Sequence, residues 1–154
     1  MPLVEVHQTI RGQADEVFQL IKDMESYPRF MPSLNEVRVL ERGENWTITA
    51  WDSTLNGMSF RWRERDEFDD VETRIKYSQI EGDLEKFEGE WIVKQDGDHT
   101  RVTLTVDFDF GVPMLSSILN PVAKVKLRQN GESMLKAIKE RFEGRSTTNS
   151  QFGS

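Results

Sequence analysis

Cysteine is absent from the 154-residue chain, which excludes disulfide bonds and thiolate chemistry. This absence is typical of proteins in a reducing compartment, so we expect a cytoplasmic location. No apolar run approaches the roughly 20 residues that a membrane-spanning helix needs. The formal net charge of -7 argues against nucleic acid as a partner, because phosphate binding requires a basic surface.

Histidine is scarce as well, and its placement offers no catalytic or metal centre. His7 falls on the outward phase of the first predicted strand, and His99 follows a turn. The two do not form a ligand pair, and neither is placed to activate a serine. Glycine-rich phosphate loops are also missing. We therefore expect no metal ion and no cofactor.

Alternation of apolar and polar residues is the main pattern that the chain does contain. It is clearest over 99–110, where one face carries Val102, Leu104, Val106, Phe108 and Phe110. Weaker alternation predicts further strands at 3–10, 35–41, 46–51, 58–68, 72–80 and 84–94. Turn signals such as Asn56-Gly57 separate these strands, and such short connections predict antiparallel hairpins.

Helical spacing of apolar residues predicts one helix near 13–21 and a long one over about 113–142. Two prolines within 27–32 allow only short helical turns before the next strand. Pro121 should kink or divide the long helix. Gly131 costs about 1 kcal/mol against alanine in mid-helix, so it is either a tolerated weakness or a point of close approach to the sheet or to a ligand.

This order of elements predicts an α+β fold with two short helices after the first strand. A seven-stranded curved antiparallel sheet wraps around the long C-terminal helix. Because one helix cannot cover so wide a sheet, the sheet must curl and enclose a cavity. We expect a hydrophobic small molecule as its partner. Residues 1–143 form this ligand-binding domain, and the small, polar residues 144–154 form a disordered tail.

One strand face points side chains with possible chemistry toward the predicted cavity. Met58, Phe60, Trp62 and Glu64 share this face by alternation. Glu64 is then a carboxyl group in an apolar space, where burial raises its pKa and makes it a candidate general acid or base. The alternative is a glutamate near the sheet edge, solvated or paired with an arginine. Asp66 could share a proton with Glu64 or lie in water beyond the cavity mouth.

The remaining candidates are polar or aromatic residues expected to face inward. Tyr77 joins Glu64 and Asp66 as a candidate catalytic residue. The candidate ligand-binding residues are Gln8, Phe60, Trp62, Gln79, Phe87, Trp91, Phe108, Asn130 and Met134. The aromatic ones suit flat aromatic or isoprenoid ligands, although ordinary core packing would explain them equally. The polar ones could bind a ligand or satisfy polar groups of the core.

A basic outer side is expected on the long helix. It is formed by Lys124, Lys126, Arg128, Lys136, Lys139 and Arg141. A solvated helix face is the ordinary interpretation of such a charge pattern. Transient contact with an acidic partner or with membrane headgroups is the alternative. The oligomeric state does not follow from the sequence.

Two segments resemble a known superfamily. Residues 23–32 (DMESYPRFMP) and 37–41 (VRVLE) resemble the YPxFLP…VLE signature of the coenzyme Q-binding and ribosome-association-toxin branch of the helix-grip superfamily. Gly82 through Trp91, followed by VDFDF at 106–110, is similar to the GPF…W…DFEF pattern of that branch. The resemblance covers about residues 3–142. It identifies the chain as a member of the superfamily of START domains, birch-pollen-allergen-like proteins and polyketide cyclases.

The resemblance implies a hydrophobic ligand such as a polyketide, a quinone or a lipid, but it leaves the chemistry open. Tetracenomycin-type aromatase/cyclases are also similar, and they use a serine, an arginine and a tyrosine in cyclisation. Glu64, Asp66 and Leu34 occupy those positions here, so that mechanism does not transfer directly. Trp62 and Trp91 are retained. A polyketide cyclase or aromatase, a non-catalytic lipid or quinone carrier, and a ribosome-associated interaction protein all stay open.

Overall fold

The fold is described from a computed structural model that covers residues 3–55, 57–111 and 113–152. Strand β1 (Leu3–Arg11) comes first, followed by helix α1 (Ala14–Lys22) and the 3-10 helix η1 (Met24–Arg29). The next strands are β2 (Leu34–Arg42), β3 (Trp46–Leu55), β4 (Met58–Asp69), β5 (Arg74–Gly82), β6 (Lys86–Asp96) and β7 (His99–Asp109). Helix α2 (Pro113–Phe152) ends the described chain.

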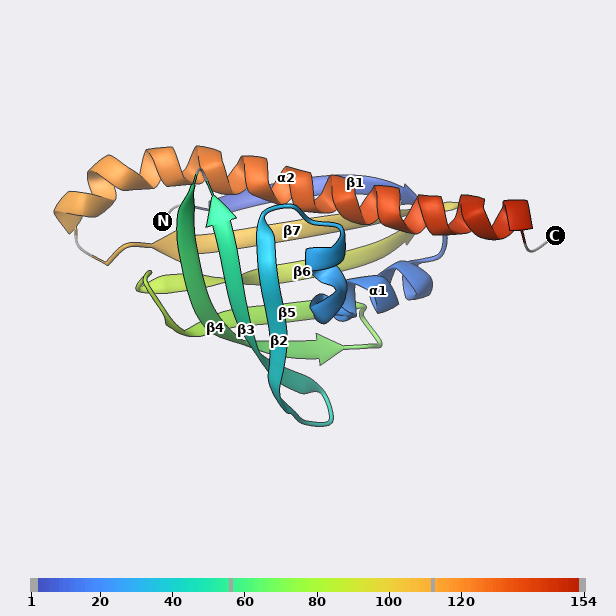
Figure 1. The fold of residues 1–154 in the computed structure, drawn as a ribbon, viewed down its shortest axis with the longest axis horizontal. Helices are drawn as coiled ribbons and strands as arrows, with labels where there is room; N and C mark the ends of the chain where they lie inside the picture. The colour runs from blue at the N-terminus through green and yellow to red at the C-terminus, as the bar shows by residue number, and fades with distance from the viewer. Residues whose placement is uncertain (1–2, 56, 112, 153–154) are drawn as a thin grey trace.

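The strands form one antiparallel sheet in the order β1-β7-β6-β5-β4-β3-β2. Sequence neighbours pair as hairpins, and β1 closes the order by pairing with β7. Figure 1 shows β2, β3 and β4 running steeply across the direction of β5, β6 and β7, while α2 lies along β1. The predicted seven-stranded curved sheet with a long C-terminal helix is therefore confirmed.

The two short helices cover one part of the concave face. Helix α1 buries Val17, Phe18, Leu20 and Ile21, which are the apolar positions that its sequence spacing predicts. In η1, Tyr27 is fully buried and its hydroxyl group donates a hydrogen bond to the carbonyl oxygen of Ile21. The Tyr27 ring also contacts Trp51 and Trp91. These contacts fill the interior on this side and leave the space under the other half of α2.

Helix α2 has two unlike parts. Its later part packs on the sheet, with Leu135 and Ile138 fully buried. A Cβ atom on Gly131 would lie only 3.1 Å from Val6 Cγ2, so this glycine marks a close approach of the helix to β1. The earlier part leaves Val122 and Val125 exposed. The helix continues through Pro121 as one element rather than two.

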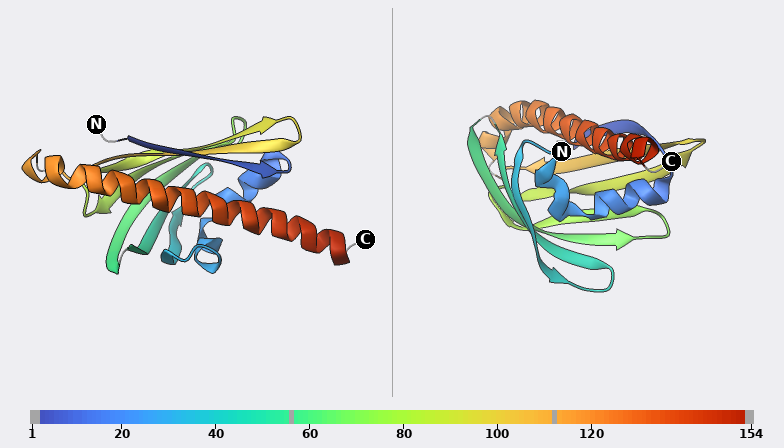
Figure 2. Two further views of the ribbon diagram at one scale, coloured as in Figure 1. Left: turned by 90° about the horizontal axis from the view of Figure 1, so that it is seen from above. Right: turned by 45° about the vertical axis from the view of Figure 1, so that its right-hand side comes forward.

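The end of α2 differs from the sequence prediction. Residues 144–152 have helical backbone, where we expected a disordered tail. The left-hand view in Figure 2 shows this end of α2 reaching beyond the sheet. Helix propagation explains the extension, because each added residue gains one hydrogen bond without a new nucleus. The domain boundary at residue 143 stays a prediction. No helix in the described ranges is long and apolar enough to cross a bilayer.

Candidate ligand-binding site

A cavity of about 360 Å³ lies between the sheet and the first half of α2, and we call it the outer chamber. Phe60, Trp62 and Phe87 line it from the sheet, and Leu119 and Val122 line it from the helix. The charged side chains that line it are those of Arg61, Asp83 and Lys126, and all three are exposed. The mouth therefore carries these charges beside the exposed side chains of Leu119 and Val122, whereas Phe108 deeper in the chamber is fully buried.

A smaller space of about 60 Å³ continues toward the sheet, and we call it the inner chamber. Trp62, Phe87, Leu127 and Asn130 line both chambers and so form the passage between them. The inner chamber adds the side chains of Leu34, Trp51, Glu64, Tyr77, Trp91, Leu104, Val106 and Met134, together with Gly131. Glu64 therefore lies on a buried wall, and the alternative of a solvated glutamate at the sheet edge is wrong.

Glu64 and Asp66 form a buried carboxyl pair. Glu64 Oε1 accepts a hydrogen bond from Trp62 Nε1 at 2.8 Å. Asp66 is fully buried and does not line either chamber. The alternative that it lies in water beyond the cavity mouth is therefore also wrong. Asp66 Oδ2 accepts hydrogen bonds from Thr47 Oγ1 at 3.0 Å and Thr49 Oγ1 at 2.7 Å. The pair thus lies behind Trp62, on the sheet side of the ligand space.

The surroundings of the pair favour the protonated form of Glu64. Burial, followed by the charge of Asp66, raises the pKa of Glu64 well above its ordinary value. Burial also raises the pKa of Asp66, but hydrogen bonds from Glu64, Thr49 and Thr47 act in the opposite direction. Asp66 Oδ1 is buried without a donor unless Glu64 is protonated. A neutral Glu64 therefore completes the hydrogen bonds of a charged Asp66.

The other polar candidates differ in how free they are to meet a ligand. Tyr77 donates from its hydroxyl group to the carbonyl oxygen of Thr105, and burial raises its pKa well above the ordinary value. Gln79 lines the outer chamber and donates to the carbonyl oxygen of Leu84. Asn130 has the weakest partner, since its Nδ2 lies 3.5 Å from the sulfur of Met134. Its amide is therefore the most available to a ligand.

Two sequence-predicted aromatic residues are more deeply placed, and one candidate lies elsewhere. Phe108 lines the outer chamber and Trp91 the inner chamber, although both are buried. Gln8 lines neither chamber, and its Oε1 accepts a hydrogen bond from the backbone nitrogen of Thr9. Gln8 does alternate with the core residues of β1. However, β1 packs beside α2 rather than under the cavity.

Strand β3 supplies residues that the sequence analysis did not single out. The ring of Trp51 stacks on Trp62, with centroids 5.6 Å apart and planes 9° apart. Trp51 Nε1 donates a hydrogen bond to Thr49 Oγ1 at 2.7 Å. Thr47, Thr49, Trp51 and Ser53 share one face by alternation, and this pattern was the available signal. Alternation within one strand does not show which strand will become its neighbour.

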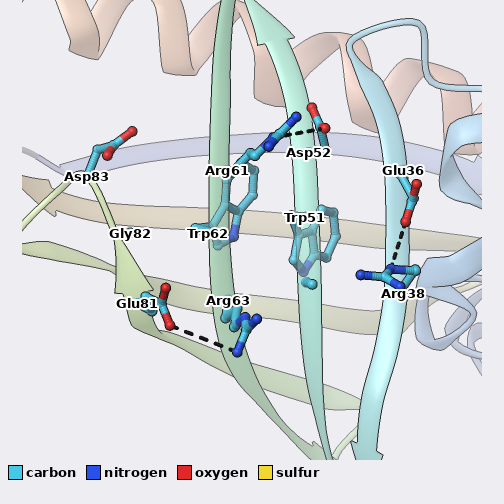
Figure 3. A pocket seen from close by; sticks show the side chains of 11 residues that line it. Glu36, Arg38, Trp51, Asp52, Arg61, Trp62, Arg63, Glu81, Gly82 and Asp83 are labelled. Atoms are coloured by element: carbon cyan, nitrogen blue, oxygen red, sulfur yellow. Dashed lines mark ion pairs between the residues drawn. The ribbon is translucent and has the colours of Figure 1, made fainter.

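A larger hollow of about 580 Å³ is lined by charged residues of β2–β5 together with Trp51 and Trp62 (Figure 3). Its side chains form ion pairs between Arg38 and Glu36 at 2.7 Å, Arg61 and Asp52 at 3.3 Å, and Arg63 and Glu81 at 3.9 Å. Each of these arginines is exposed and already has a carboxylate partner. This outer hollow is therefore a poor site for an apolar molecule, and the outer chamber is the better one.

Comparison with known proteins agrees with this architecture. Two curated relatives are the persistence and stress-resistance toxin PasT of Escherichia coli O6:H1 and the ribosome association toxin RatA of Escherichia coli K12. They are 27% and 25% identical to this chain over 111 residues, which is 71% of this chain and 70% of each relative.

Solved structures are similar over nearly the whole chain. The protein TTHA0849 from Thermus thermophilus has 29% identity and a TM-score of 0.88, covering 94% of this chain and 99% of that one. The Zhui aromatase/cyclase from Streptomyces sp. R1128 has 22% identity and a TM-score of 0.85, covering 94% of each chain, and it supports the fold. The family described as polyketide cyclase / dehydrase and lipid transport matches residues 10–135. The chain belongs to this family and has its helix-grip fold.

Proposed function

We propose that this protein binds a neutral, ring-containing apolar molecule in the outer chamber and holds it without converting it. The observation that carries this proposal is the distribution of polarity around the chamber. Its interior walls are aromatic and aliphatic, and its charged side chains are exposed at the mouth. A buried charge on a ligand would find no compensating ion there, whereas an apolar surface would be removed from water.

The size of the chamber limits the class of ligand. A volume of about 360 Å³ is near the lower end of the range of roughly 300–1,000 Å³ for small-molecule sites. This favours one compact molecule, such as a quinone headgroup or an aromatic polyketide, over a lipid with two acyl chains. Phe60, Trp62 and Phe87 present ring surfaces suited to a flat guest. Asn130, between the chambers, is placed to bind one carbonyl or hydroxyl group.

The state of the candidate catalytic residues favours binding over chemistry. The hydroxyl group of Tyr77 is already bonded to Thr105, and Asp66 lies behind the chamber walls. Glu64 Oε1 accepts a hydrogen bond from Trp62, and a proton on Glu64 would be donated to the partnerless Oδ1 of Asp66. None of these three groups is therefore left with an unused proton or a free charge facing the ligand.

A polyketide cyclase or aromatase is the second candidate. Its specific support is that Glu64 lies on the inner-chamber wall, where burial raises its pKa, so that it could act as a general acid. Most of the rate enhancement would then come from holding a poly-β-keto chain in a reactive shape away from water. Glu64→Gln that keeps ligand affinity but abolishes product formation would favour this candidate, and unchanged turnover would remove Glu64 from the mechanism.

A direct test of the binding proposal fills the chamber from the helix side. Ala123 lines the outer chamber, whereas Gln129 on the same helix is exposed and lines neither chamber. We expect the neutral dye N-phenyl-1-naphthylamine to fluoresce with the wild type and with Gln129→Phe, but not with Ala123→Phe. Native mass spectrometry of the protein from its source should show a co-purifying molecule. Equal dye binding by both variants would contradict the proposal.

The name of one relative, the ribosome association toxin RatA, points to a third possibility, which is association with ribosomes through the outer surface. The same variant separates this possibility from ligand binding. Ribosome co-sedimentation that is equal for the wild type and Ala123→Phe would favour an interaction surface independent of the chamber.

A further inference from the structure

We propose that Glu64 and Asp66 are positioning residues: together they form a one-proton clamp that holds the stacked rings of Trp51 and Trp62. Ligand affinity at Trp62 would then depend on a proton that the ligand need not touch. This inference extends the proposed function. Only its prediction about ligand affinity rests on that function.

Hydrogen bonds lead from each indole to one member of the carboxyl pair, and a proton on Glu64 that is donated to Asp66 would join the two halves. Trp62 Nε1 donates to Glu64 Oε1 at 2.8 Å. On the other side, Trp51 Nε1 donates to Thr49 Oγ1 at 2.7 Å, and that hydroxyl donates to Asp66 Oδ2 at 2.7 Å. Both indole N–H groups therefore lead to the same carboxyl pair, which links the orientations of the two rings.

The rings held in this way form part of the ligand space. Trp62 lines both chambers and Trp51 lines the inner one. They stack nearly parallel, and Phe87 meets the Trp62 ring edge-on with centroids 5.4 Å apart. A shift of Trp62 would change the passage between the chambers. The affinity for a bound guest should therefore depend on the orientation of this ring.

One proton is what closes the chain. Asp66 Oδ1 is buried and lacks a donor unless Glu64 supplies one. A protonated Asp66 is a weaker acceptor for the two threonines than a carboxylate, and with no proton the two carboxylates would repel each other in a site of low dielectric. The state with one proton gives Asp66 Oδ1 a donor and keeps a charged acceptor for both threonines.

The pair forms no ion pair in the described ranges, although Lys22 and Arg42 line a separate pocket beyond Thr47 and Thr49. The titratable groups that interact with both carboxyl groups are Tyr27 of η1 and Tyr77 of β5. The neutral neighbours are Thr47 and Thr49 of β3, Trp91 of β6, and Asn130 and Met134 of α2. Within the described ranges, no lysine, arginine or histidine contributes to the interactions of either carboxyl group. Rising pH should therefore break the clamp.

The proton can be detected without any ligand. Infrared spectroscopy should show the carbonyl stretching band of a protonated carboxylic acid in the wild type at neutral pH. The band should be lost in Glu64→Gln and retained in Glu90→Gln, because Glu90 is ion-paired with Arg74. A wild type without this band at neutral pH would overturn the proposal.

The positioning role needs a second readout that also avoids the ligand. Stacked indoles give a near-ultraviolet circular dichroism signal that depends on their mutual orientation. In the wild type this signal should change with pH at the same midpoint as the infrared band. In Glu64→Gln it should be independent of pH, because a glutamine amide can accept from Trp62 and donate to Asp66 at any pH. An indole signal that does not follow the band would refute the clamp.

Dye affinity then links the clamp to binding. We expect wild-type affinity for N-phenyl-1-naphthylamine to fall by roughly tenfold as Glu64 ionises, an effect of the size of one buried hydrogen bond. Glu64→Gln should keep the low-pH affinity throughout, and Glu64→Leu should be weak throughout. If Glu64→Leu binds as tightly as the wild type, positioning is wrong. If the wild type never binds the dye but both spectroscopic signals behave as expected, the proposed function fails and the clamp stands.

Discussion

The hydroxyl group of Tyr77 donates a hydrogen bond to the carbonyl oxygen of Thr105 at 2.6 Å, although β5 and β7 are not neighbouring strands. Strand β6 lies between them, and the residue that it places opposite Tyr77 is Gly89. A Cβ atom at Gly89 would overlap the same carbonyl oxygen and would crowd the Tyr77 hydroxyl group. The missing side chain is what lets Tyr77 reach across a strand.

Gly89→Ala should consequently destabilise the protein by about 2–3 kcal/mol, because a backbone oxygen cannot move away cheaply. Tyr77→Phe should cost only about 1 kcal/mol, since it removes one hydrogen bond without an overlap. Urea unfolding followed by circular dichroism measures both values. If Gly89→Ala is no more destabilising than Tyr77→Phe, the side chain of Tyr77 does not pass over Gly89 of β6 as described.

Replacing Glu64 should change how stability depends on pH. The folded pKa of Glu64 is raised, mainly by burial, above the unfolded value of about 4.3. The folded state therefore holds the proton more tightly, and the stabilisation is complete below about pH 4.3. It is lost as pH rises through the folded pKa, by up to about 1.4 kcal/mol per pH unit between the two values.

The measurement is the difference in free energy of unfolding between the wild type and Glu64→Gln over this pH range. The wild type should lose stability relative to the variant as pH rises, and Glu90→Gln should show no such trend against the wild type. A difference that stays constant with pH would mean that Glu64 is not protonated in the folded protein.

Gly131 should tolerate alanine far better than leucine. An alanine Cβ would meet Val6 Cγ2 at 3.1 Å, which costs some packing but is offset by about 1 kcal/mol of helix propensity. Leucine would overfill the same contact and should cost about 1–3 kcal/mol. Thermal unfolding of the two variants checks this order. A leucine variant as stable as the alanine variant would mean that α2 does not approach β1 so closely.

Gly144→Ala tests whether α2 extends past residue 143. A Cβ atom at Gly144 meets no atom within 4 Å, so the substitution acts through helix propensity alone. If the helix continues to Phe152, the change should stabilise it by up to about 1 kcal/mol and raise the helical circular dichroism signal. No gain in helical signal would instead support the tail that the sequence predicts.

Much of the fold could be predicted because alternation and helical spacing act over long segments, and β7 illustrates this. The inward direction of Glu64 was one of two alternatives that alternation left open, and Met58, Phe60 and Trp62 precede it in the same phase. The site was harder, because it depends on which strands become neighbours. Trp51 stacks on Trp62 only because β3 pairs with β4 in a register that places these two residues opposite each other.

Gln8 shows the opposite limitation. Its phase in β1 matches the core residues Val6 and Ile10, but phase says nothing about position along the helix that covers the strand. The length of α2 and its close approach at Gly131 determine where space remains, and both arise from packing in three dimensions. Asn130 and Met134, one turn apart on α2, were expected to face inward, and both line the inner chamber, while their binding of a ligand stays a prediction.

Gly131 separates a part of α2 that is anchored on the sheet from a part that overhangs the outer chamber. Leu135 and Ile138 are fully buried, whereas Val122 and Val125 are 58% and 53% exposed. Segments with few buried contacts open at lower free energy than the core does. The first half of α2 can therefore move away from the sheet at a lower free energy than the second half. Substitutions in this first half should change how long a guest stays bound, while the buried second half should keep the global stability unchanged.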